Sequence, residues 1–300
     1  MAETHTEIYR PFEGRLRSRA LRFLPLCLAG IRVAARRKLP LILLFTPPAI
    51  TGIVSSFIVY AKFSLEQEVG TRGVTDAGLR IAIAMARQMT QVHNQIVGSQ
   101  RAIQTFALLV IAWFGAGLIA EDRKQGAHLL YFSRPLTRLD YFLGHFCTVA
   151  FYGLCAVLGP GLLICTVATF SSPDYSFLKE EWDVIAATFG FALVCVGVLA
   201  ALVLAVSSLV NRKSFALAGV FGLVVASQAV GGVMSELEAD EDFLMIGIWS
   251  NLFRLADWMF GARRPIFHWD PRWSVVILSS LFVLCVGVCA WRIRRLEVVA

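Results

Sequence analysis

Charged side chains are scarce in this chain. Only 16% of its 300 residues are Asp, Glu, Lys or Arg, whereas 57% are hydrophobic. A soluble domain carries about 25% charged residues, so the composition excludes an ordinary soluble globular protein and favours a membrane protein. The formal net charge of +7 does not indicate nucleic-acid binding, because the basic residues flank apolar runs and form no basic domain.

Lysine is rare as well, and its positions exclude a P-loop nucleotide site. None of the lysines follows a glycine, so the pattern GxxxxGK[ST] cannot be satisfied. The HExxH and GxSxG patterns of metalloproteases and serine hydrolases are also missing. The seven cysteines form no CxxC pair, which favours packing over a metal site or a disulfide. We therefore expect a non-catalytic chain without a cofactor or a metal of its own.

Long apolar runs are the feature that the chain does have. Six of them predict membrane-spanning helices at about 39–61, 102–120, 141–170, 184–210, 215–234 and 274–291. At about 1.5 Å rise per residue, such runs can cross about 30 Å of hydrocarbon. The predicted fold is an all-α membrane protein with one transmembrane domain over 39–291, preceded by segment 1–38 and followed by tail 292–300.

Two further segments have the pattern of amphipathic helices. From Pro25 to Lys38 apolar residues recur at helical spacing, with Arg32, Arg36 and Arg37 on the polar side, which predicts a helix in the membrane interface. Residues 235–273 begin acidic and continue as an amphipathic helix that ends near a pair of tryptophans. Whether this second segment enters the membrane is left open.

Small residues recur every fourth position in the fourth and fifth predicted spans, where they allow helix backbones to approach closely. They are Gly197 and Ala201 in the fourth span, and Ala218, Gly222 and Ala226 in the fifth. We interpret them as helix-packing positions, most simply between these two consecutive spans, with a seam between two copies as the alternative.

The charge distribution predicts which side each loop faces. Six spans place both termini on one side, which holds 18 of the 28 basic residues but only 7 of the 21 acidic ones. The net charge is then +11 on that side and −4 on the other. The positive-inside rule makes the first side cytoplasmic and the protein a multi-pass protein of the inner membrane.

Ionisable residues are missing from the middle of the predicted spans, where Gln228 is the one strongly polar side chain. Transporters coupled to protons or ions need such residues in the bilayer. Their absence disfavours a secondary transporter, and the lack of a polar helix face disfavours a channel. A helical bundle without an energy-coupling site of its own instead suggests that a separate protein, a motor that hydrolyses nucleotide, drives it.

The charged segment between the second and third spans is the natural contact for a motor. Glu121 and Asp122 open it, which suits a helix N-terminus, and Gly126 permits close approach of another backbone. Pro135 ends or turns the segment, and Thr137 or Asp140 is a candidate cap for the next helix. These features predict a short helix with defined ends, although an ordinary solvated loop is an equal alternative.

The stretch GLIAEDRKQGAHLLYFSRPLTRLDYFLGHF, residues 117–146, resembles the signature of type-2 ABC transporter permeases. That family has a Glu-x-Arg-x-x-Gly element and a Ser-x-Pro-x-x-Arg element at these places. The matching residues are Glu121, Arg123, Gly126, Ser133, Pro135 and Arg138, with Asp122 inside the first element.

The resemblance implies a six-span permease subunit of an ABC exporter, in which residues 121–138 dock on the ATPase and the segment near Pro25 to Lys38 acts as a connecting helix. It implies two copies of a cytoplasmic ATPase, which carry the ATP and Mg²⁺, and a second permease as a homodimer or with a paralogue. The bilayer surrounds the subunit, and a periplasmic partner and the identity of the substrate are left open. The alternative is a scaffold or mechanotransmitter that the same kind of ATPase drives without solute transport.

Overall fold

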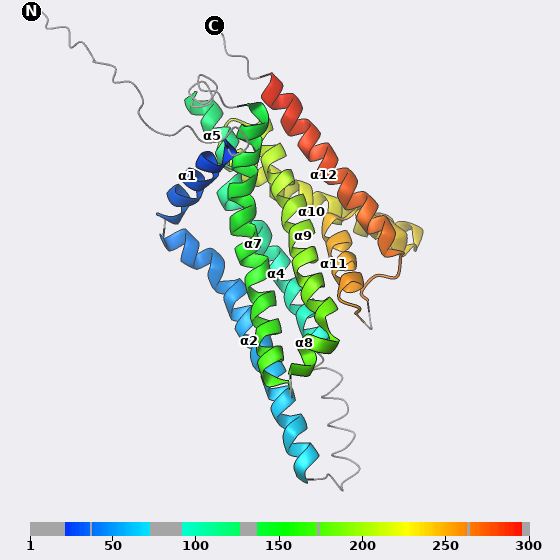
Figure 1. Cartoon of the computed structure of the whole chain (residues 1–300). Helices are drawn as coiled ribbons and strands as arrows, with labels where there is room; N and C mark the ends of the chain where they lie inside the picture. The colour runs from blue at the N-terminus through cyan, green and yellow to red at the C-terminus, as the bar shows by residue number, and fades with distance from the viewer. Residues whose placement is uncertain are drawn as a thin grey trace, which may run out of the picture.

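The computed structural model describes residues 22–36, 38–72, 92–126, 137–172, 175–262 and 265–295. Every regular element within these ranges is a helix (Figure 1). In chain order the elements are α1 (Phe23–Ala35), α2 (Lys38–Arg72), α4 (Val92–Gly115), α5 (Leu118–Gln125), α7 (Arg138–Ser171), α8 (Ser176–Glu180), α9 (Trp182–Leu209), α10 (Lys213–Glu238), η3 (Glu241–Ile246), α11 (Ile248–Met259) and α12 (Pro271–Arg294).

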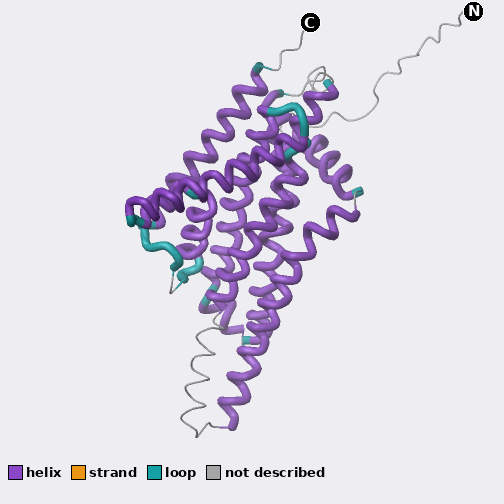
Figure 2. The backbone as a smooth tube through the Cα atoms, turned by 180° about the vertical axis from the view of Figure 1, so that it is seen from behind, coloured by secondary structure: helices purple, strands orange, loops and turns teal. Residues whose placement is uncertain are grey.

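Six stretches are long and apolar enough to cross a membrane, which confirms the predicted fold class. They lie in α2, in α4 continued by α5, and in α7, α9, α10 and α12. Figure 1 shows α1 and α5 at the end of the bundle where α12 ends, and α8 toward the opposite end. The view from behind in Figure 2 shows the same helical bundle, with the described loops in teal.

The centre of the bundle is α9. Residues 198–205 of this helix are all buried, because α4, α7, α10 and α12 surround it. A helix that is apolar on every side, as this part of α9 is, has no face that needs water. The other spans leave one face exposed, as expected for helices that border lipid.

Two helices differ from the sequence-based boundaries. Helix α4 begins at Val92, ten residues before the predicted second span, and it takes Gln100, Arg101 and Gln104 into the bundle. Helix α7 spans Arg138–Ser171 and continues through Pro160, although a proline removes a backbone donor inside a helix. Close packing supports α7 there, because a Cβ on Gly52 of α2 would stand only 2.9 Å from Pro160 Cβ.

The small residues of α10 do not pack against α9 as we expected. Ala218, Gly222 and Ala226 are exposed, and a Cβ on Gly222 would meet nothing within 4 Å. The buried positions of α10 are instead Ala216, Val220 and Val224, which lie on the opposite face. In α9, Ala201 is fully buried, whereas Gly197 borders a groove.

Candidate functional site

Helix α5 is a separate short helix at the end of the second span. The helix is interrupted between α4 and α5 by a turn at Ala116 and Gly117. Buried Ser207 of α9 bridges this break: its hydroxyl donates to the Ala116 carbonyl at 2.8 Å and accepts from the Ala120 amide at 3.2 Å. A polar contact to α9 therefore replaces part of the helical hydrogen bonding and sets the direction of α5.

Gly126 ends α5 in a left-handed conformation, with φ of 69°. Glycine adopts this conformation without the steric cost that a Cβ would bring, and it is the usual residue after the last helical turn. A short helix with defined ends is therefore present, but it spans Leu118–Gln125: it begins before Glu121, which we expected to open it, and it ends at Gly126 rather than near Pro135. Its first turn carries Glu121, as the electrostatics of a helix N-terminus favour.

One face of α5 is fastened to α7 through Asp122. The hydroxyl of Tyr141 donates to Asp122 Oδ2 at 3.0 Å, and His145 Nε2 lies 3.3 Å from the same oxygen. Tyr141 is fully buried, and its ring packs edge-on against the imidazole of His145. Asp122 thus joins α5 to the first two turns of α7.

The same face is fastened to the end of α9 through Arg123. Its Nη1 donates to the carbonyl of Ser208 at 2.6 Å, and Arg292 Nε of α12 donates to the same carbonyl at 3.4 Å. Carbonyls in the last turn of a helix lack intrahelical partners and carry negative partial charge, so cations are favourable there. We expected Arg123 to dock on a partner, but the structure places it inside the chain, between α5, α9 and α12.

The opposite face of α5 is exposed, in part toward a cavity that α1 also borders. Glu121, Lys124 and Gln125 are exposed and share one side of the helix at helical spacing. Arg138 is exposed at the first turn of α7, next to a capping box in which Thr137 Oγ1 accepts from the Asp140 amide at 3.1 Å. Ser133 and Pro135 lie outside the described residues.

Helix α1 lies directly on α7, close to α5. Tyr152 Oη donates to the Ile31 carbonyl at 2.7 Å. Thr148 Oγ1 shares its proton between the Gly144 carbonyl of its own helix at 2.8 Å and the Cys27 carbonyl of α1 at 3.3 Å. The outward-facing Arg32 and Arg36 are exposed, as predicted for the polar side of an interfacial helix. Arg37 lies outside the described residues.

A cavity of about 270 Å³ separates α1 from α5. Its walls carry both apolar and charged side chains, among them Leu26, Asp122, His145 and Lys213. The Lys213 ammonium stands 4.3 Å from the centre of the Trp113 ring, a cation–π contact that ties the start of α10 to α4.

Two charged residues outside the predicted spans form an ion pair against the bundle. Arg101 of α4 and Asp257 of α11 form a salt bridge, and Asp257 Oδ2 also accepts from the Ile266 amide at 3.0 Å. The Asp257 side chain is fully buried. Arg101 immediately precedes the predicted second span. From the sequence we missed that the helix begins earlier and therefore includes Arg101.

Comparison with known proteins agrees with this architecture. The model of the ABC-2 family transporter proteins matches residues 31–259, which include α2 to α11 and therefore all of α5. No relative among curated proteins matches the chain. The match covers well over half of the sequence and coincides with a six-span helical bundle. This multi-pass membrane protein therefore belongs to the ABC-2 family of transporter proteins.

Proposed function

We propose that the chain is the permease subunit of an ABC exporter and that a separate cytoplasmic ATPase drives it through α5 and the residues that follow. Membership of the ABC-2 family supports a permease subunit. The coupling to an ATPase and the export direction are the new parts of the proposal.

The observation that carries the proposal is the two-sided character of α5. One side is fastened to α7 by Asp122 and to α9 by Arg123. The other side presents Glu121, Lys124 and Gln125 to solvent. A force on the exposed side is then delivered to two spans at once, which a solvated loop cannot do.

Helix α1 passes the movement of α7 on to the first span. Because α1 is hydrogen-bonded to α7 at Ile31 and Cys27, a tilt of α7 moves α1 with it. Helix α2 starts directly after α1, so the first span follows. This supports the role of connecting helix that we proposed for Arg32, Arg36 and Arg37.

The charge asymmetry between the loops supports an inner-membrane location with both termini in the cytoplasm. We propose two ATPase copies, which bind ATP and Mg²⁺, and a second permease copy or paralogue. The exposed small-residue face of α10, with Ala218, Gly222 and Ala226, is the surface on which the second permease packs.

The experiment reconstitutes the permease with its co-purified ATPase and measures how far the permease stimulates ATP hydrolysis. Glu121→Lys reverses an exposed charge on the open side of α5 and should lower stimulation by about three- to tenfold, as charge reversal at an interface weakens association. Glu180→Lys is the matched control, because Glu180 is also exposed but lies in α8 at the opposite end of the bundle.

Unchanged melting temperatures of both variants would show that the fold is intact. Equal stimulation by wild type and Glu121→Lys would refute docking at α5. Solute export by the permease in vesicles without any ATPase would refute the driven mechanism itself.

A further inference from the structure

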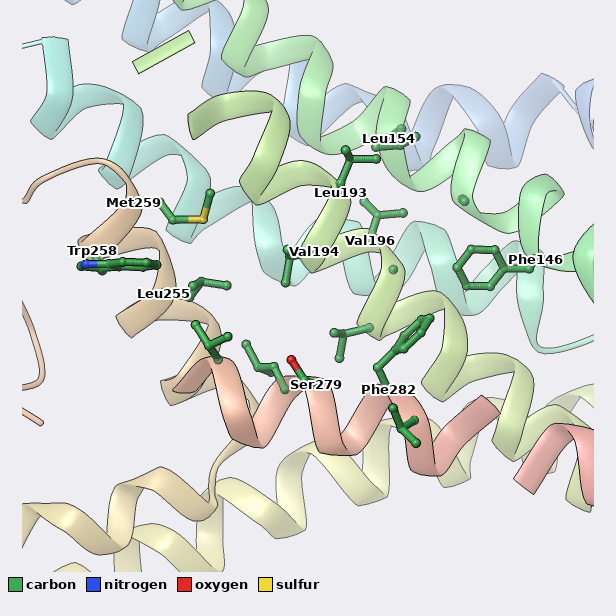
Figure 3. Close-up of a pocket in the computed structure, with 16 residues that line it drawn as sticks. Phe146, Leu154, Leu193, Val194, Val196, Leu255, Trp258, Met259, Ser279 and Phe282 are labelled. Carbon is green, nitrogen blue, oxygen red and sulfur yellow. The ribbon is translucent and has the colours of Figure 1, made fainter. Parts of the chain in front are cut away.

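A groove runs along the side of the bundle, from the N-terminal half of α7 to α11. This lateral groove has a volume of about 630 Å³ and lies between α7, α9, α11 and α12. Figure 3 shows Trp258 and Met259 at one end and Phe146 and Phe282 at the other. Leu193 and Val194 of α9 form the wall between these ends.

The lining of the lateral groove is almost entirely apolar. The only polar side-chain groups among its residues are the Ser279 hydroxyl and the Trp258 indole N–H. Water needs two to four polar partners to occupy a buried site, so the groove does not suit a string of ordered waters. The groove is therefore suited to bind a hydrocarbon chain.

The groove is open toward the surroundings at the level of the membrane. Leu193 of α9 is 62% exposed and Val283 of α12 is 68% exposed, and both helices are spans. The lining residues of α12 extend from Val275 to Val283, which is about 12 Å of helix. Half of the hydrocarbon core is about 15 Å, so this part of α12 is slightly shorter than one leaflet is thick.

One end of the groove has the features of a lipid headgroup site. Trp258 is 55% exposed, as expected for an indole at the membrane interface. Arg272 lies one turn before Val275 on the same face of α12 and is exposed. Within the described part of the chain, the Arg272 guanidinium has no hydrogen bond or ion pair, so its charge is available to a phosphate.

We propose that the lateral groove binds one acyl chain of a phospholipid whose phosphate contacts Arg272, at the Trp258 end of the groove. The size of the groove favours a chain over a helix of another copy, because a helix about 10 Å wide and 12 Å long occupies roughly 900 Å³. The site does not depend on the cargo of the transporter. The bound lipid fills the space between α11 and the spans α9 and α12.

Photolabelling of the full-length chain tests the proposal. The protein is placed in phosphatidylcholine vesicles that contain a small fraction of phosphatidylglycerol with a diazirine near the middle of one acyl chain. After irradiation, labelled peptides are identified by mass spectrometry. We expect the label on the groove residues of α9 and α12 to exceed that on the lipid-exposed face of α2 at Ile53 and Phe57, which reports random contact with bulk lipid.

Gly197→Leu is the blocking variant. Gly197 lines the groove and a Cβ there would meet nothing within 4 Å, so a leucine enters the groove without a clash. Displacement of about two methylenes should lower groove labelling about tenfold. Gly287→Leu is the matched control, because Gly287 of α12 also has open space around it but does not line the groove.

Arg272→Gln tests the headgroup contact. It should lower labelling by the phosphatidylglycerol probe severalfold but leave labelling by a diazirine diacylglycerol, which has no phosphate, unchanged. Groove labelling that is equal in wild type and Gly197→Leu, or no greater than on α2, would overturn the acyl-chain site. Equal effects of Arg272→Gln on both probes would overturn the phosphate contact, and links from the groove to a second protein copy would replace the lipid by a protein partner.

Discussion

Gly144 of α7 lies directly against Leu26 of α1: a Cβ on Gly144 would stand 2.6 Å from Leu26 Cδ2. The contact is reciprocal, because a Cβ on Gly30 of α1 would stand 2.7 Å from Thr148 Oγ1. The two helices therefore approach more closely than side chains would permit. This close approach brings the hydroxyls of Thr148 and Tyr152 within reach of the α1 carbonyls.

Gly144→Ala should loosen the contact between α1 and α7. The added methyl group overpacks the contact with Leu26, which we expect to lower the free energy of unfolding by about 1–3 kcal/mol. Thermal unfolding of the purified protein measures the change. Gly159→Ala in the same helix is the control, since a Cβ there meets nothing within 4 Å. Equal melting temperatures for the two variants would contradict the close approach.

Tyr141→Phe should weaken the attachment of α5 to α7. The variant keeps the buried ring but loses the hydrogen bond to Asp122, which contributes about 1 kcal/mol or more because the acceptor is a carboxylate. Denaturant or thermal unfolding provides the measurement. Tyr175→Phe, at an exposed tyrosine before α8, should change stability little. If both variants unfold alike, the Tyr141–Asp122 bond does not stabilise the fold.

Breaking the buried ion pair should cost far more than breaking an exposed one. Arg101→Leu leaves the buried Asp257 carboxylate without its cation, and we expect a loss of about 3–5 kcal/mol. Glu241→Gln breaks the exposed pair with His268 and should cost less than about 1 kcal/mol.

Addition of Asp257→Asn to Arg101→Leu tests whether the unpaired carboxylate causes the loss of stability. The neutral amide needs no cation and can still accept from the Ile266 amide, so the double variant should recover part of the loss. A double variant that is less stable than Arg101→Leu alone would show that the pair is not the source of the effect.

A photo-crosslinking side chain at Gly222 should link two copies of the permease. Gly222 is exposed in α10 and has open space around it, as a contact between two closely packed helices requires. Gly287 of α12 is equally exposed and provides the control position. The readout is a covalent dimer on a denaturing gel. Dimers of equal yield from both positions would argue against an α10 seam.

Much of the fold follows from features that are local in the sequence. Six apolar runs predict six spans because a chain in hydrocarbon must satisfy its backbone hydrogen bonds internally, and a helix does so within one segment. The capping box of Thr137 and Asp140 and the end of α5 at Gly126 are local as well, since each depends on a few neighbouring residues. These parts need no knowledge of the neighbouring helices.

The face that each helix presents depends on its neighbours. Spacing identified the small residues around Gly222, but only the bundle shows that Val220 and Val224 are the buried side of α10. Likewise, the motif positions Glu121 and Arg123 are only two residues apart. The structure shows that the Glu121 side chain is exposed, whereas the Arg123 side chain contacts α9 within the chain. The hydrophobic effect has no direction within an apolar span, so composition cannot assign these faces.

By itself, then, the sequence determined a six-span helical membrane protein with a charged segment after the second span, because length and hydropathy act over a few residues. Only the tertiary structure decided that Arg123 contacts the end of α9, that Arg101 pairs with Asp257 across 156 positions, and that a groove lies beside α12. Such contacts join residues far apart in the chain, and their partners are selected by the packing of whole helices.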